Sequence, residues 1–205
     1  MDGMEMLLTR RSVKKLKPIP IGKDVVKKIL YAATVAPSAH NAQPWRFIVV
    51  DDPLAKTKLA KGMASILIRD LIRDGYTKAE AEEEAEESIS RIEAASLIIV
   101  ACVTMEGMDT YPDRRRRRCE YLMAIQSVSA AIQNLLLAAH YEGLGACWRC
   151  APLFAQSVVK RILRIPKGFD PVALIEIGQR AIEVSAPPRK PLEEVAYHNM
   201  WGEKF

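Results

Sequence analysis

The sequence has no long uninterrupted hydrophobic segment. Its longest apolar run, Leu97 to Val103, is far shorter than the about 20 apolar residues that a membrane-spanning helix needs. Residues Met1 to Arg10 contain no extended apolar stretch followed by a small-residue cleavage site, which a secretory signal would require. We therefore expect a cytoplasmic protein without membrane contact.

Cysteine and histidine are also scarce. The four cysteines include one closely spaced pair, Cys147 and Cys150, but Cys102 and Cys119 do not form a second one. The three histidines are scattered, so the remaining ligands of a structural zinc site are missing, and we expect no metal site. A redox pair is the alternative, although this segment is strand-like and does not begin a helix as in thioredoxin-like motifs. Reduced cysteines fit a cytoplasmic protein better.

The excess of positive charge comes from one place. The formal net charge is +5, and the run Arg114 to Arg118 supplies five charges, so the rest of the chain is balanced. No zinc finger, aromatic RNA-binding signature or helix-turn-helix spacing accompanies the run, and we expect no nucleic-acid partner. It is either a solvated helix start or a lid over an anionic ligand. The acidic segment Lys78 to Ala95 lacks the Asx/Gly pattern of calcium-binding loops.

A length of 205 residues predicts a single domain over residues 1–205, in which helices and strands alternate. β-branched and aliphatic runs predict strands at Trp45 to Val50, Ser96 to Thr104, Leu144 to Arg149 and Val172 to Gln179. Helical periodicity, capping residues and breakers predict helices at Asp24 to Thr34, Leu54 to Asp74, Lys78 to Ala95, Arg114 to Tyr141 and Pro152 to Leu163.

A group of cationic side chains follows the N-terminal residues. Arg10 and Arg11 carry planar guanidinium groups that can bind phosphate oxygens in pairs, Ser12 can add a neutral donor, and Lys14 adds a further cation. These residue types together predict a phosphate-binding site. The alternative from the residues alone is a solvated basic helix end.

The stretch Ala36 to Val50 joins a helix end, a polar turn and a hydrophobic strand. Pro37 and Pro44 hold the backbone between them in a non-helical path, which leaves amide groups free to face a ligand. Ser38 and Asn41 add short polar side chains in the same turn. Such a loop before a buried strand is typical of a binding site, and an ordinary helix-to-strand turn is the alternative.

Two segments indicate contact with another subunit. The predicted helix Arg114 to Tyr141 combines a broad apolar face with small residues on its other faces, which is typical of a core helix or of a subunit interface. The tail Ala186 to Phe205 contains large apolar residues with little periodicity. An apolar tail without its own core is expected to cover another surface, such as a second subunit.

Four motifs occur in an order that resembles the nitroreductase family of FMN flavoproteins. They are Arg10-Arg11-Ser12, then Pro37 to Trp45 (PSAHNAQPW), then Gly143 to Trp148 (GLGACW), then Arg189-Lys190-Pro191-Leu192. The resemblance covers nearly the whole chain. It implies an α+β fold, a sandwich in which a central mixed or antiparallel sheet is flanked by helices, and an intertwined homodimer with two FMN sites at its interface.

The resemblance also implies which residues bind FMN. By their positions in the motifs, these residues are Arg10, Arg11, Ser12, Lys14, Pro37, Ser38, Ala39, Asn41, Trp148, Arg149 and Arg189. The first four and Arg189 would hold the phosphate and ribityl side. The Pro37 to Asn41 loop would come from the other subunit to the flavin ring, and the strand at Trp148 would pass beside the cofactor. No catalytic side chain is expected, since the chemistry resides in the flavin.

The implied activity is a ping-pong cycle in which NADH or NADPH passes a hydride to FMN and the reduced flavin reduces a small organic acceptor. A closer resemblance joins Arg69-Asp70-Leu71, Tyr111-Pro112-Asp113 and Glu120 to the nitroreductase-type domain of deazaflavin-coenzyme glutamyl ligases, whose ligase domain this sequence lacks. The acceptor classes are therefore nitroaromatic, quinone or deazaflavin-type compounds, and Arg114 to Arg118 could steer an anionic one. A non-catalytic flavin sensor or cofactor store is the alternative.

Overall fold

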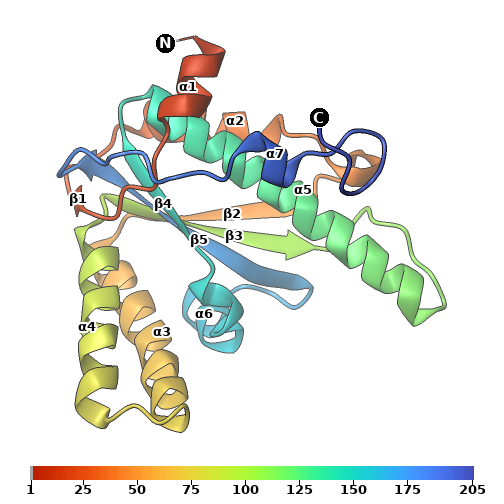
Figure 1. Ribbon diagram of the computed structural model, residues 1–205. Coiled ribbons are helices and arrows are strands. Elements are labelled where there is room, and N and C mark those ends of the chain that lie inside the picture. The colour runs from red at the N-terminus through yellow and green to blue at the C-terminus, as the bar shows by residue number, and fades with distance from the viewer. Residues whose placement is uncertain (1) are drawn as a thin grey trace.

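A five-stranded antiparallel sheet forms the centre of the molecule. The computed structural model describes residues 2–205 (Figure 1). Four strands follow the order β1-β5-β3-β2, and β4 also pairs with β5. The strands are β1 Leu16–Lys17, β2 Trp45–Val50, β3 Leu97–Thr104, β4 Gly145–Arg149 and β5 Phe169–Arg180. Since β5 pairs with three other strands, it holds the sheet together.

Helices cover both faces of this sheet. The helices are α1 Gly3–Thr9, α2 Lys23–Thr34, α3 Pro53–Arg73, α4 Lys78–Ala94, α5 Arg114–Tyr141, α6 Gln156–Leu163 and α7 Leu192–Val195, with short 3-10 turns η1 Ala39–Asn41 and η2 Ala151–Leu153. Figure 1 shows α2 and α5 on one face and α3, α4 and α6 on the other. Every residue of β3 is therefore buried, Ile99 among the residues of the α5 side and Ile98 among those of the α3 side.

The α+β fold with a helix-flanked antiparallel sheet is as predicted. The predicted strand Trp45–Val50 and the predicted helix Arg114–Tyr141 have the bounds that the sequence indicated. The capping box that begins α4 is formed, because Thr77 Oγ1 accepts from the Glu80 amide while the Glu80 carboxylate accepts from the Thr77 amide. These segments follow periodicity and capping signals that act over a few residues.

Other boundaries differ from the sequence-based expectation. The helix predicted from Pro152 to Leu163 is wrong in its first part, because Ala155 leaves helical angles (φ −126°, ψ 28°) and separates η2 from α6. The last strand is longer than predicted and starts at Phe169, where pairing with β3 extends it. The short elements α1, β1 and α7 were not predicted, since each is too short to show a clear period.

Helix α5, with 28 residues, is the longest helix of the described chain. Asp113 caps its start by accepting from the Arg116 amide. At its end Gly143 adopts φ +78°, and the amides of Gly143 and Leu144 donate to the carbonyls of His140 and Ala139, which is a Schellman motif. Among the described residues, α5 alone is long and apolar enough to cross a membrane by composition. The core helix of a soluble protein passes the same test, and α5 packs on the sheet.

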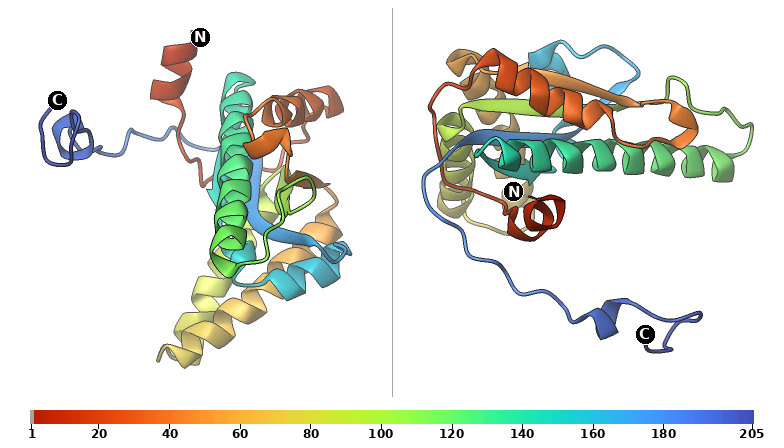
Figure 2. Two further views of the ribbon diagram at one scale, coloured as in Figure 1. Left: turned by 90° about the vertical axis from the view of Figure 1, so that its right-hand side faces the viewer. Right: turned by 90° about the horizontal axis from the view of Figure 1, so that it is seen from above.

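The C-terminal tail extends away from the rest of the chain in both views of Figure 2. Its large apolar side chains are mostly exposed, with Trp201 at 90%. Tyr197 and Trp201 pack on each other within the tail, their ring centroids 4.7 Å apart. The tail thus presents apolar surface that this chain does not cover.

Candidate flavin site

Three arginines from the two ends of the chain lie near one another. Arg10 and Arg11 follow the last residue of α1 and are half-buried. Burial lowers the pKa of Arg10, and the charges of Arg11 and Arg189 lower it further. The charge of Arg189 acts on Arg10 because the start of the tail passes near Arg10. The structure therefore groups three of the five residues predicted to bind the phosphate.

Two further side chains extend this cationic cluster. Arg180 Nη2 lies 2.6 Å from His140 Nδ1, and Thr9 Oγ1 lies 2.9 Å from His140 Nε2. Burial lowers the pKa of His140, and the charges of Arg180, Arg10 and Arg11 add to this effect. A neutral imidazole that accepts from Arg180 and donates to Thr9 satisfies both contacts. His140 lies in the last turn of α5, and the sequence did not single out Arg180 because it ends a buried strand without a motif beside it.

The segment after α1 is held against β4. Arg11 Nη1 donates to the Leu8 and Arg10 carbonyls, but its Nε is buried and has no hydrogen-bond partner in the described chain. Ser12 forms a parallel bridge with Ala146 of β4. The approach is close, because a Cβ on Gly145 would lie 2.8 Å from Cδ2 of Leu16 and 3.0 Å from Cβ of Val13, so that a larger residue would force these neighbours to shift. Ser12 and Lys14, both exposed, thus lie beside the third motif.

The η1 loop carries the second group of predicted residues. His40, Asn41 and Gln43 have positive φ angles of 55°, 51° and 48°, a left-handed conformation that is uncommon for residues other than glycine. Ser38 Oγ accepts from the Gln43 amide at 3.1 Å, and Ser127 Oγ of α5 accepts from the Ala39 amide at 3.1 Å. The loop is therefore tightly folded and attached to the middle of α5.

The two groups of predicted residues lie far apart in one chain. The cationic cluster contacts α5 at His140, and the η1 loop contacts it at Ser127. Thirteen residues of helix separate these positions, which at about 1.5 Å per residue amounts to about 20 Å. Within a single chain, the structure does not bring Arg10 and Asn41 into one compact site.

Trp148 and Arg149 point to opposite faces of the sheet, because side chains alternate along β4. Trp148 packs with the residues on the α5 side, and its indole Nε1 is buried without a hydrogen-bond partner in the described chain. Arg149 Nε lies 3.5 Å from the buried carboxylate of Glu176. The two side chains are thus not brought together, and only Trp148 faces the layer of α5.

The family model described as "Nitroreductase family" matches residues 7–179 of this chain. The chain belongs to the nitroreductase family. The match spans every strand except the last residue of β5 and includes the first three of the four motifs.

Proteins similar in sequence or in structure agree with this assignment. A 5,6-dimethylbenzimidazole synthase from Rhodospirillum rubrum is 30% identical over 191 residues, which cover 86% of this chain and 82% of that protein. A BluB-like flavoprotein from Clostridium difficile 630 has a TM-score of 0.78 at 21% identity and covers 97% of this chain and 99% of its own. An NADPH:FMN oxidoreductase from Vibrio harveyi, solved with NAD⁺, has a TM-score of 0.74 at 20% identity, covering 98% and 78%. The two solved structures show that the fold is shared, and the family model shows that this chain is a member of the nitroreductase family.

Proposed function

We propose that this protein is an FMN-dependent oxidoreductase that passes a hydride from NADH or NADPH to a small organic acceptor by a ping-pong cycle. The observation that carries the proposal is the buried Arg11 Nε, a donor without a hydrogen-bond partner in the described chain, next to Arg10 in a chain of this family. Guanidinium groups held close together repel one another, so an anion between them offsets a cost that the protein otherwise bears.

The residues present fit a flavin mononucleotide. The three arginines supply the donors that a phosphate needs, and the Arg11 Nε is a buried donor without a partner. Ser12 and Lys14 lie next to them along the edge of β4 and would contact the ribityl side. When bound, FMN supplies hydride transfer; the chain supplies the anion site, orientation and shielding from water.

We further propose that the site is completed by a second copy of the chain. The η1 loop, with Pro37, Ser38, Ala39 and Asn41, lies about 20 Å along α5 from the cationic cluster, so a second chain would supply it. Leu122 is 48% exposed on α5, and the tail exposes still more apolar surface. A homodimer would bury both regions and would set free amides of the loop beside the flavin ring.

Several finer assignments remain part of this proposal. The acceptor classes are nitroaromatic, quinone and deazaflavin-type compounds, and Trp148 and Arg149 would border the cofactor through their strand. We expect the protein to be a single domain in the cytoplasm that binds neither nucleic acid nor membrane. A flavin-binding sensor or cofactor store would use the same residues without turnover.

A second candidate activity is the synthesis of 5,6-dimethylbenzimidazole. It is favoured by the 30% identical synthase from Rhodospirillum rubrum, which this chain matches over most of both lengths. A search for 5,6-dimethylbenzimidazole by mass spectrometry, in reaction mixtures with FMN, NAD(P)H and oxygen, distinguishes it from transfer to an external acceptor.

The test of the main proposal is the visible absorption spectrum of the purified protein, with and without added FMN, followed by anaerobic NADH and NADPH. We expect flavin bands that bleach with at least one nucleotide and return when an acceptor is added. Arg10→Gln should weaken FMN binding by about 10-fold or more, because a charge-assisted contact to phosphate is lost, whereas the exposed control Lys61→Gln should not. A protein that does not bind FMN would overturn the proposal, and bleaching by stoichiometric reductant without NAD(P)H turnover would favour the sensor or store.

A further inference from the structure

Three potential metal ligands meet on the α5 side of the molecule. His40 comes from η1, Asp109 from the loop after β3, and Glu120 from the second turn of α5. One ligand atom from each of the three side chains lies within 4.8 Å of the others. None of the three was assigned to flavin binding by the motifs, and they come from three segments that are separate in sequence.

Glu120 is the buried member of this cluster, and one of its carboxylate oxygens has no hydrogen-bond partner in the described chain. The residue is 3% exposed, and its Oε2 is buried without a hydrogen-bond partner in the described chain. His40 Nε2 lies 3.4 Å from this oxygen, which is too far for a good hydrogen bond. A buried carboxylate oxygen without a partner costs free energy, so this position favours a bound cation.

The spacing of the donor atoms suits a small divalent ion. Zinc bonds of about 2.0–2.2 Å in tetrahedral geometry place ligand atoms about 3.3–3.6 Å apart. The distance from His40 Nε2 to Glu120 Oε2 is 3.4 Å, and that from His40 Nε2 to Asp109 Oδ2 is 4.0 Å. The Asp109 side chain is 58% exposed, so it can close the remaining gap without moving buried groups.

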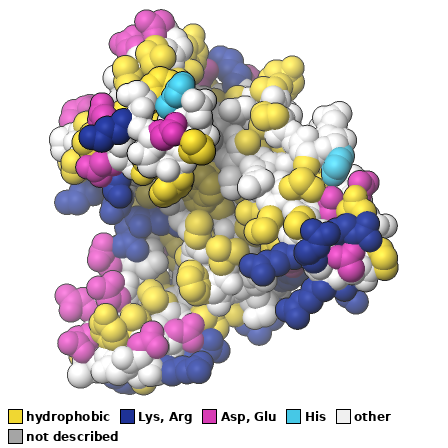
Figure 3. Space-filling model, turned by 45° about the vertical axis from the view of Figure 1, so that its right-hand side comes forward, with side chains coloured by type: hydrophobic (Ala, Val, Ile, Leu, Met, Phe, Trp, Pro, Cys, Tyr) yellow, Lys and Arg dark blue, Asp and Glu magenta, His cyan; other side chains and the backbone are white. Residues whose placement is uncertain are grey.

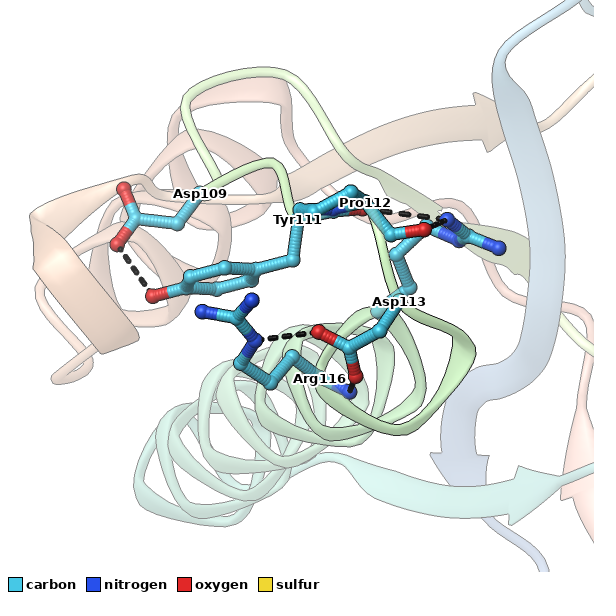
Figure 4. A network of polar contacts seen from close by, with 6 residues as sticks. Asp109, Tyr111, Pro112, Asp113 and Arg116 are labelled. Carbon is cyan, nitrogen blue, oxygen red and sulfur yellow. Dashed lines mark hydrogen bonds and ion pairs between the residues drawn. The ribbon is translucent and has the colours of Figure 1, made fainter.

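A neighbouring network orients Asp109. Figure 4 shows the Tyr111 hydroxyl directed at Asp109, where it makes a long hydrogen bond of 3.3 Å to Oδ2. The Arg116 guanidinium lies 4.4 Å from the centre of the Tyr111 ring and is paired with Asp113, which keeps this cation away from Asp109. Hydrogen bonds of this kind hold metal-binding carboxylates in place in known metal sites.

We propose that His40, Asp109 and Glu120 bind one divalent transition-metal ion, with Zn²⁺ as the best fit and a water or substrate oxygen as a fourth ligand. An imidazole nitrogen with two carboxylates favours zinc and its neighbours in the first transition row over Mg²⁺ or Ca²⁺, which prefer oxygen donors in larger number. The ion would join the η1 loop to α5 and to the loop after β3. The metal proposal does not rest on the proposed flavin function, although His40 lies in the η1 loop that is proposed to approach the flavin.

The test is a titration of metal-depleted, full-length protein with ZnCl₂, read by isothermal calorimetry and by competition with a chromophoric chelator at matched flavin content. We expect one Zn²⁺ per chain, and visible bands of tetrahedral Co²⁺ in difference spectra when CoCl₂ replaces zinc. His40→Asn removes the imidazole but suits the left-handed backbone at this position, and should weaken binding by more than about 100-fold. Tyr111→Phe, which releases Asp109, should weaken binding by about 10-fold.

Two control variants test whether zinc binding is specific to the three proposed ligands. His198→Ala removes an exposed histidine outside the cluster, and Cys119→Ser removes the exposed thiol next to Glu120 in the sequence; both should bind zinc like the wild type. Glu120→Gln tests the buried ligand, with circular dichroism to establish that it folds, and His40→Asn carries the test if it does not. Absence of stoichiometric zinc binding, equal binding by His40→Asn, or loss of binding in Cys119→Ser would each overturn the proposal.

Discussion

Glu176 is an acidic residue in the middle of the sheet that is 2% exposed. It lies on β5 opposite Cys147 of β4, and its closest cation is Arg149, 3.5 Å away. Burial raises the pKa of Glu176 above its ordinary value of 4.5 despite the opposing effects of Arg149 and Arg91. A cavity of about 210 Å³ is lined in part by Glu176, Arg149 and Arg91. The pair therefore resembles other buried ion pairs, in which desolvation rivals attraction.

This raised pKa predicts a pH dependence of stability. The folded protein holds the Glu176 proton more tightly than the unfolded chain, so the stabilising contribution is complete below about pH 4.5 and is lost as the pH rises through the folded-state pKa. The free energy of unfolding of Glu176→Gln, relative to the wild type, should therefore rise as the pH increases above about 4.5, within a measured range of about pH 4 to pH 8. While the pH lies between the unfolded and the folded pKa, the rise is about 1.4 kcal/mol per pH unit.

Urea denaturation of both proteins across this range measures the difference. The exposed Glu183→Gln is the control and should show no such trend. A flat difference between Glu176→Gln and the wild type would contradict the prediction.

At the scale of elements, the first turns of α5 carry an unfavourable charge pattern. Cations at a helix N-terminus oppose the helix dipole, by about 0.3–1 kcal/mol each near the surface. Arg116 pairs with Asp113, and Arg117 donates to the carbonyls of Tyr111 and Pro112. No side-chain hydrogen bond or ion pair in the described chain involves Arg114, Arg115 or Arg118. Figure 3, which turns the right-hand side of Figure 1 forward, shows Lys and Arg side chains gathered on that side.

Replacing Arg114, Arg115 and Arg118 tests both the effect of this charge on the helix and the steering of an anionic acceptor. We expect the triple change Arg114→Gln, Arg115→Gln and Arg118→Gln to raise stability slightly, because the opposition to the helix dipole is removed. If the run steers an anionic acceptor, kcat/KM for that acceptor falls about 10-fold at low salt and the loss shrinks at high salt, while a neutral acceptor is unaffected. A control triple change to Gln on the exposed face of α3 should leave both acceptors unchanged; it uses Lys58, Lys61 and Arg73. Unchanged kinetics with the anionic acceptor would remove the steering hypothesis.

At the scale of the whole molecule, much apolar surface is left uncovered. On α5, Leu122 is 48% exposed and Leu137 is half-buried, on a stripe whose other members Gln126, Ser129 and Gln133 are polar. The tail adds Met200, Trp201 and Phe205, each at least 66% exposed. Apolar surface of this extent is typical of a protein–protein interface.

We expect the protein to sediment as a dimer, and Leu122→Glu combined with Leu137→Glu to shift it toward monomer because a buried charge without a partner opposes association. If the flavin site needs both chains, this variant also loses FMN affinity by at least about 10-fold. Analytical ultracentrifugation with absorbance at the flavin bands measures both effects. Leu54→Glu, at a residue 81% exposed at the start of α3, is the matched control. A monomer with unchanged FMN affinity would contradict the two-chain site.

The sequence by itself determined the local elements and the family. The strand at Trp45–Val50, the helix at Arg114–Tyr141 and the Thr77–Glu80 cap follow from side-chain periodicity and backbone hydrogen bonding, which act within a few residues. The motifs also indicated the nitroreductase family, whose family model matches residues 7–179.

Only the tertiary structure decided which distant residues meet. Arg189 lies near Arg10 because the start of the tail passes the N-terminal segment before it extends away from the body (Figure 2), and Arg180 lies near them because β5 ends beside α5. His40 and Glu120 are eighty positions apart, and their contact depends on how η1 packs against α5. No local pattern encodes such contacts, since they depend on the packing of helices on both faces of the sheet, which the whole chain sets together.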